Sequence, residues 1–146
     1  MSTFRSSEFA WAPETILLEG FTSLDRRPNV LVTGPLAELD SVSERILPWC
    51  ARPCRVLVLP GALHLDEERP RTLLLRRVEA LALAQQIVLY DWLTASRGRV
   101  QVFSLASAPL EELVEAGLFL ESLFHRLTTV RLDVVAARPC STSVIA

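Results

Sequence analysis

The chain has 146 residues, of which half are apolar and 22% are charged, and its formal net charge is −2. A mean hydropathy of +0.31 is too high for an intrinsically disordered chain, and the length suits one globular domain. The longest charge-free apolar run covers residues 80–90, whereas a membrane span needs roughly 20 residues, so no membrane partner is expected.

Short apolar runs alternate with helical patterns along most of the chain. Residues 1–28 are polar and are predicted to form an ordered arm, with Phe9, Trp11 and Ile16–Leu18 docked on the core. The domain itself is expected over 29–138, followed by a frayed end at 139–146. The predicted strands are 30–33, 55–59, 72–75, 100–105 and 130–135, and the predicted helices are 37–47, 79–95, 109–115 and 117–127.

The strands are apolar at nearly every position, which indicates burial on both faces. Such strands are typical of a parallel sheet with helices on each side. We therefore predict an α/β fold: a three-layer sandwich with a five-stranded, mostly parallel sheet. Within the helix predicted at 79–95, the spacing places a set of large side chains on one side: Leu81, Gln85, Val88, Leu89 and Trp92.

All fifteen basic residues are Arg. Arg stays protonated and cannot act as a Schiff-base amine, so lysine-dependent chemistry is excluded. The isoelectric point is near 5.7 and the Arg residues are scattered, which argues against direct contact with nucleic acid.

The three cysteines are Cys50, Cys54 and Cys140. Their number is odd and no apolar signal segment follows Met1, so we expect a reduced, cytoplasmic protein of bacterial type. Cys50 and Cys54 have a C-x3-C spacing, but no second Cys or His pair completes a zinc site. We interpret these two as free thiols and expect no metal.

Four segments carry a resemblance to a known family. Thr72–Leu81 is similar to a T-L-F-L-D-E-I-x-x-L stretch, and Val100–Ser107 is similar to a V-R-V-I-A-A-T-N strand. Leu110–Phe119 is similar to D-L-E-E-L-V-x-x-G-x-F, and Leu123–Leu127 to L-Y-Y-R-L. In this order they resemble the AAA+ core of sigma-54-dependent transcription activators, over about residues 29–135. The resemblance implies a P-loop-NTPase-like fold, and no counterpart of the lid subdomain is expected.

The resemblance also aligns residues 30–41 with the phosphate-binding P-loop of the family. Gly34 matches the first glycine, whereas the later glycines are replaced by Ala37 and Leu39 and the lysine by Asp40. A P-loop needs bare backbone N–H groups around phosphate and a lysine for the β- and γ-phosphates. We expect Asp40 to lie at a helix N-terminus, where its carboxylate interacts with the free N–H groups and repels a triphosphate.

The remaining nucleotide-handling positions differ as well. The family's Asp-Glu pair, which serves Mg²⁺ and water, is replaced by Arg76 and Arg77, and neither can ligate a cation. Ser107 stands at the γ-phosphate-sensing position, Leu120 at the first trans-acting arginine and Arg126 at the second. Residues 60–71 replace the long insertion that carries G-A-F-T-G-A in the family. The resemblance therefore implies a degenerate nucleotide site at Gly34, Asp40, Arg76, Arg77, Ser107 and Arg126.

These substitutions predict a non-catalytic AAA+-like domain, a pseudo-ATPase without cofactor, that acts as a protein-interaction or regulatory module. A protein partner is expected at Phe119, Leu120 and Phe124, and a monomer or dimer is expected in place of a hexameric ring. Two alternatives remain open. One is a nucleotide-binding sensor without hydrolysis that uses Arg76, Arg77 and Arg126 as phosphate clamps. The other is a transcription regulator that acts through a partner.

Overall fold

The computed structural model describes residues 2–5, 27–65 and 69–134. Within them, six parallel strands form one sheet in the order β1-β6-β2-β5-β4-β3. The strands are β1 (Ser2–Arg5), β2 (Val30–Thr33), β3 (Cys54–Val58), β4 (Thr72–Arg76), β5 (Gln101–Ala106) and β6 (Val130–Asp133).

The five predicted strands and the parallel α/β fold are confirmed, but the sheet also includes β1. This strand lies at the sheet edge, where Ser2 is the register partner of Val130. Its four residues, Ser-Thr-Phe-Arg, carry no apolar run that would mark them as a strand. The sequence prediction placed residues 1–28 in an ordered arm and did not include this strand. The expected docking of Phe9, Trp11 and Ile16–Leu18 and the fraying of 139–146 lie outside the described residues.

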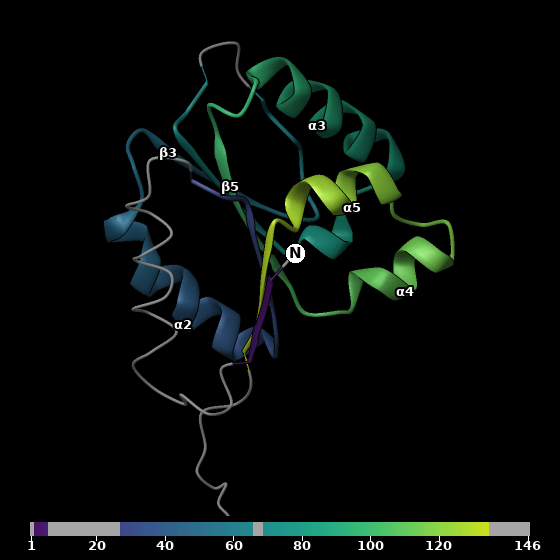
Figure 1. Cartoon of the computed structure of the whole chain (residues 1–146), viewed down its shortest axis with the longest axis horizontal. Helices are drawn as coiled ribbons and strands as arrows, with labels where there is room; N and C mark the ends of the chain where they lie inside the picture. Colours follow the sequence, from purple (N-terminus) through teal and green to yellow (C-terminus); the bar gives the residue numbers. More distant parts are fainter. Residues whose placement is uncertain (1, 6–26, 66–68, 135–146) are drawn as a thin grey trace, which may run out of the picture.

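The helices cover both faces of the sheet, so the three predicted layers are present. Helix α2 lies on one face, and α3, α4 and α5 lie together on the other (Figure 1). The described helical segments are α2 (Leu36–Ile46), η2 (Leu47–Trp49), η3 (Val78–Ala80), α3 (Leu83–Ser96), α4 (Leu110–Glu115) and α5 (Glu121–Leu127). None of them is long and apolar enough to cross a bilayer.

Alternate side chains of each strand enter different cores. Leu31 packs into the core under α3, α4 and α5, whereas its neighbours Val30 and Val32 pack into the core under α2. Leu73 and Leu75 in the same way face away from Leu74. All six of these β2 and β4 side chains are completely buried, as expected for strands covered on both faces.

Helix α3 differs from its prediction. The chain forms the short helix η3 first, and α3 begins only at Leu83. The buried face consists of Gln86, Leu89, Leu93 and Ser96, whereas Val88, which was predicted to face inward, is 52% exposed. The prediction failed because α3 is apolar on nearly all sides, so the spacing of its apolar residues does not distinguish the inner face.

Gln86 fixes the orientation of α3. Its Nε2 donates to the carbonyl oxygens of Leu81 at 3.1 Å and Leu118 at 3.0 Å, and its Oε1 accepts from the Leu120 N–H at 2.8 Å. The side chain is completely buried, so these partners satisfy an amide that would otherwise be costly to desolvate. Gln86 thereby joins α3 to the loop between α4 and α5.

At the other edge of the sheet, β3 is incompletely covered. Val56 is 38% exposed and Val58 is 55% exposed. The connection from β3 to β4 contains no helix in its described parts, 59–65 and 69–71. This agrees with the short span at residues 60–71 that the sequence predicts.

Gly34 is required by close packing at the end of β2. A Cβ at this position would lie 2.3 Å from the Val134 carbonyl oxygen, and the Val134 N–H is bonded to the Thr33 oxygen at 2.7 Å. Because the clashing atom belongs to a bonded backbone, we expect Gly34→Ala to lower the free energy of unfolding by about 3 kcal/mol in urea denaturation. Gly98→Ala is the control. Its Cβ meets nothing within 4 Å at a φ of +75°, and it should cost only about 1 kcal/mol. Equal losses would contradict this account of Gly34.

Candidate functional site

The carboxyl ends of the parallel strands meet at one edge of the sheet. The register pairs Thr33 with Ala106 and Arg76 with Leu105, so the residues that follow β2, β4 and β5 are neighbours. Ligand sites in open α/β sheets lie at this edge. Of the six predicted site residues, the structure places five here: Gly34, Asp40, Arg76, Arg77 and Ser107.

The segment aligned with a P-loop is helical. Helix α2 begins at Leu36, two residues after Gly34, and the Leu39 N–H already donates to the Pro35 carbonyl oxygen at 3.0 Å. Pro35 has the N-cap position with a φ of −62°, and the residues that follow it favour helix more strongly than glycine does. The backbone therefore winds into a helix where a P-loop would remain open.

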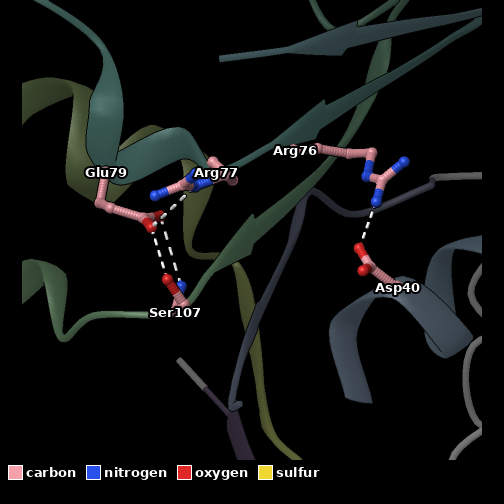
Figure 2. Close-up of polar contacts among 5 residues, drawn as sticks. All are labelled: Asp40, Arg76, Arg77, Glu79 and Ser107. Atoms are coloured by element: carbon pink, nitrogen blue, oxygen red, sulfur yellow. Dashed lines mark hydrogen bonds and ion pairs between the residues drawn. The ribbon is translucent and has the colours of Figure 1, made fainter. Parts of the chain in front are cut away.

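Asp40 does not lie at the helix N-terminus, which corrects the sequence prediction. It is the fifth residue of α2, and no side chain caps this helix. Asp40 instead forms an ion pair with Arg76, in which the Arg76 Nη2 donates to the Asp40 Oδ1 (Figure 2). The two side chains are 47% and 33% exposed, so the pair joins α2 to the end of β4 at the surface.

A second polar cluster lies beside the first. Arg77 has a left-handed φ of +62°, which turns the chain sharply after β4. Figure 2 shows the Arg77 side chain directed to Glu79, away from Arg76, and its Nε lies 3.9 Å from the Glu79 Oε2. The Ser107 hydroxyl donates to the Glu79 Oε2 at 2.6 Å, and the Ser107 N–H lies 3.3 Å from the Oε1. One carboxylate thus connects the ends of β4 and β5.

Sequence reasoning missed the role of Glu79 and treated it as the first residue of a long helix. A signal was present, because Glu79 closely follows β4 and Ser107 directly follows β5. In a parallel sheet, both positions belong to the carboxyl edge.

Arg126 lies apart from the other predicted site residues. Its carbonyl oxygen accepts from the Asn29 Nδ2 at 2.9 Å, and Asn29 immediately precedes β2, so Arg126 is at the amino edge of the sheet. Its guanidinium carbon is 5.1 Å from the centre of the Tyr90 ring on α3, a cation–π contact that the sequence did not suggest. The two side chains border an open hollow of about 450 Å³ together with Asn29, Ser122, His125 and Thr129.

The predicted partner surface is not exposed. Phe119 and Phe124 are 3% and 7% exposed and belong to the core beneath α3, and Leu120 packs half-buried against the same core. Leu120 is the N-cap of α5, so the three residues do not share one outward helix face. The expectation of an apolar patch at Phe119, Leu120 and Phe124 was therefore wrong.

The Asp40–Arg76 pair makes a testable contribution to stability. We expect a double-mutant cycle with Asp40→Ala and Arg76→Ala to give a coupling energy of about 0.5 kcal/mol at low salt, because the pair is solvent-exposed. Raising the ionic strength to about 1 M should weaken the coupling. Urea denaturation of the four chains measures it. If Asp40 acted on the helix end alone, Asp40→Ala would lower the free energy of unfolding by the same amount whether or not Arg76 is present.

Comparison with known proteins agrees with this architecture. The model of the sigma-54 interaction domain family matches residues 53–136. NtrX from Brucella abortus in complex with ATP has a TM-score of 0.69 and 20% identity, covering 88% of this chain and 37% of NtrX. The NtrX complex with ADP has a TM-score of 0.69 and 18% identity, covering 88% of this chain and 36% of the other.

No curated protein sequence matches this chain significantly. The chain spans little more than a third of the NtrX structures, 36–37% of their length. The family match includes Arg76, Arg77, Ser107 and Arg126 and begins after Asp40. It confirms the resemblance on which the site prediction depended: the chain belongs to the sigma-54 interaction domain family, with the AAA+ fold of sigma-54 activators.

Proposed function

We propose that this sigma-54 activator-type AAA+ domain does not hydrolyse nucleotides and acts as a protein-interaction or regulatory module. The observation that carries the proposal is the ion pair between Asp40 and Arg76. The family resemblance assigns a phosphate-binding lysine to position 40 and a Mg²⁺-binding aspartate to position 76. In this chain the two charges are reversed, and the two side chains bind each other.

Each half of the pair is unsuited to the nucleotide chemistry of its position. The Asp40 carboxylate repels phosphate, whereas a lysine would attract it. The Arg76 guanidinium has no lone pair to offer Mg²⁺ and cannot accept a proton from an attacking water. Because α2 begins at Leu36, the backbone in front of Asp40 also lacks the open loop that surrounds phosphate in P-loop proteins.

A nucleotide sensor without hydrolysis is the second candidate, since arginine grips phosphate well. A nucleotide sensor of this kind requires Arg76, Arg77 and Arg126 to converge on one ligand. Arg76 is directed to Asp40, and Arg77 is directed to Glu79 (Figure 2). Arg126 stacks on Tyr90 at the amino edge of the sheet. The three cations therefore have three different partners, and the arrangement favours the non-nucleotide function.

The outer face of α3 is the surface we assign to a protein partner. Leu83, Ile87 and Val88 are 44%, 52% and 52% exposed, and among the exposed residues of this helix only Asp91 is charged. A helix that is apolar on all sides is normally buried on all sides. Leu118, in the loop between α4 and α5, is a further exposed apolar residue, at 57%.

Such a patch fits an apolar face of another protein chain. The isoelectric point near 5.7 disfavours direct contact with DNA. The apolar patch and the acidic isoelectric point therefore favour a transcription regulator that acts through this protein contact over one that binds DNA itself.

Calorimetry with Mg-ATP and with Mg-ADP tests the absence of a nucleotide site. We expect no binding tighter than roughly millimolar, because the phosphate-binding loop and its lysine are missing. A micromolar Kd would contradict the proposal and favour the sensor. The triple variant Ala37→Gly, Leu39→Gly, Asp40→Lys should still show no turnover, since Arg76 and Arg77 remain.

Light scattering over a range of concentrations tests the mode of assembly. We expect a monomer or a two-fold dimer, and the mass should not grow when ATP is added.

Ile87→Glu and Val88→Glu should change the free energy of unfolding by less than about 0.5 kcal/mol and should abolish any rise of mass with concentration. Leu89→Ala, on the buried side of α3, is the matched control and should cost about 2–5 kcal/mol. A stable hexamer, or unfolding by the two Glu variants, would contradict these assignments.

A further inference from the structure

Cys50 and Cys54 flank a three-residue loop at the edge of the sheet and pack on the same core. Cys50 directly follows η2 and is 4% exposed in the core under α2, whereas Cys54 is the first residue of β3 and packs half-buried against that core. The Cys50 thiol donates to the Ile46 carbonyl oxygen at 3.3 Å, and its interaction with the Cys54 side chain is the largest influence on its pKa.

The loop between the two cysteines is held by β4. The Thr72 hydroxyl donates to the Ala51 carbonyl oxygen at 2.9 Å, and the Arg71 N–H donates to the Pro53 carbonyl oxygen at 2.8 Å. In addition, Cys54 is the register partner of Thr72 in the sheet. The backbone of the loop that joins the two cysteines is therefore held by the sheet.

The two sulfurs have different acidities. The hydrogen bond from Cys50 and the charge of Arg52 lower the pKa of Cys54 to about 7, against the opposing effect of burial. The same hydrogen bond and burial raise the pKa of Cys50 far above its usual value. Near neutral pH a thiolate therefore forms on Cys54, the more exposed of the two residues, whereas Cys50 keeps its proton. A nucleophilic thiolate beside a neutral thiol is the arrangement of an attacking and a resolving cysteine.

We propose that Cys50 and Cys54 are a peroxide-reactive dithiol, in which Cys54 attacks and Cys50 resolves. In the first step the Cys54 thiolate attacks one oxygen of a hydroperoxide. An S–O bond forms and the O–O bond breaks, so the sulfur is oxidised by two electrons to a sulfenic acid and hydroxide (or alkoxide) leaves. In the second step the Cys50 sulfur attacks the Cys54 sulfur. The S–S bond forms, the S–O bond breaks, and the departing hydroxide takes the Cys50 proton as water. With hydrogen peroxide, two thiols yield one disulfide and two waters.

The disulfide would connect the end of η2, which continues α2, to the first residue of the edge strand β3. This site is separate from the Asp40–Arg76 pair and from the outer face of α3. The proposal therefore stands independently of the proposed function.

Peptide mapping of the whole chain tests the proposal directly. Trypsin does not cut before proline, so both thiols fall in one peptide, residues 46–55, and Cys140 falls in another, residues 132–146. The folded chain is treated with hydrogen peroxide, denatured, alkylated and digested, and the masses of the peptides are measured by mass spectrometry. We expect the 46–55 peptide to lose two hydrogen atoms and to take up no alkyl group. A peptide that still carries two alkyl groups, under conditions that oxidise free glutathione, would overturn the proposal.

Cys50→Ser and Cys54→Ser assign the two roles and serve as controls for each other. With Cys50→Ser, we expect the Cys54 sulfenic acid to accumulate and to be trapped by dimedone. With Cys54→Ser, Cys50 should remain a thiol over the same time, because it is buried and protonated. Limiting iodoacetamide at pH 7 should label Cys54 in the native chain at least roughly ten-fold faster than Cys50. Equal labelling, or oxidation of Cys50 in the Cys54→Ser chain at the wild-type rate, would refute the assignment.

Discussion

A sheet of parallel strands must be covered on both faces, and its strands must all end at the same edge. In this chain α2 covers one face and α3, α4 and α5 cover the other, so every central strand is buried on both sides. The same constraint gathers the residues after β2, β4, β5 and β6 at the carboxyl edge. The close approach of Gly34 to the Val134 carbonyl group and the bond from the Thr33 hydroxyl to the Asp133 carboxylate both follow from it.

At that edge, polar groups of the chain bind one another. Asp40 binds Arg76, and Glu79 accepts from Ser107 while it faces Arg77. In a nucleotide-binding site such groups face the ligand, and the binding energy comes from preformed donors and cations that have no partner within the protein. Here a ligand would have to displace intramolecular partners and replace their interactions. The start of α2 at Leu36 has the same effect on the backbone from Leu39 onward, because the Leu39 N–H already donates to the Pro35 carbonyl oxygen.

The strands could be predicted from the sequence to within one or two residues at most ends, because buried parallel strands are continuous apolar runs. Pro35, Pro60 and the glycines beside them mark several of these boundaries. The edge strand β1 could not be predicted, since it pairs through backbone groups and its residues, Ser-Thr-Phe-Arg, form no apolar run. The resemblance located most of the candidate site, but a one-dimensional pattern does not show which charge meets which. Asp40 is on α2 and its partner lies 36 residues away at the end of β4, so the sequence suggested the nearby helix end instead.

The failure to identify the inner face of α3 and the assignment of its outer face have one cause. A surface helix normally shows an apolar stripe and a charged stripe, and the stripe reveals which side is buried. Helix α3 has apolar residues on both sides and buries a polar one, Gln86, whose amide is satisfied by three backbone groups. The inner face is thus defined by hydrogen bonds that involve residues outside the helix, which no periodicity can reveal. The outer face keeps Leu83, Ile87 and Val88 with a single charge, Asp91, among its exposed residues. Within the described residues, no packing contact covers those three side chains, which is why we propose this face as the contact for another protein chain.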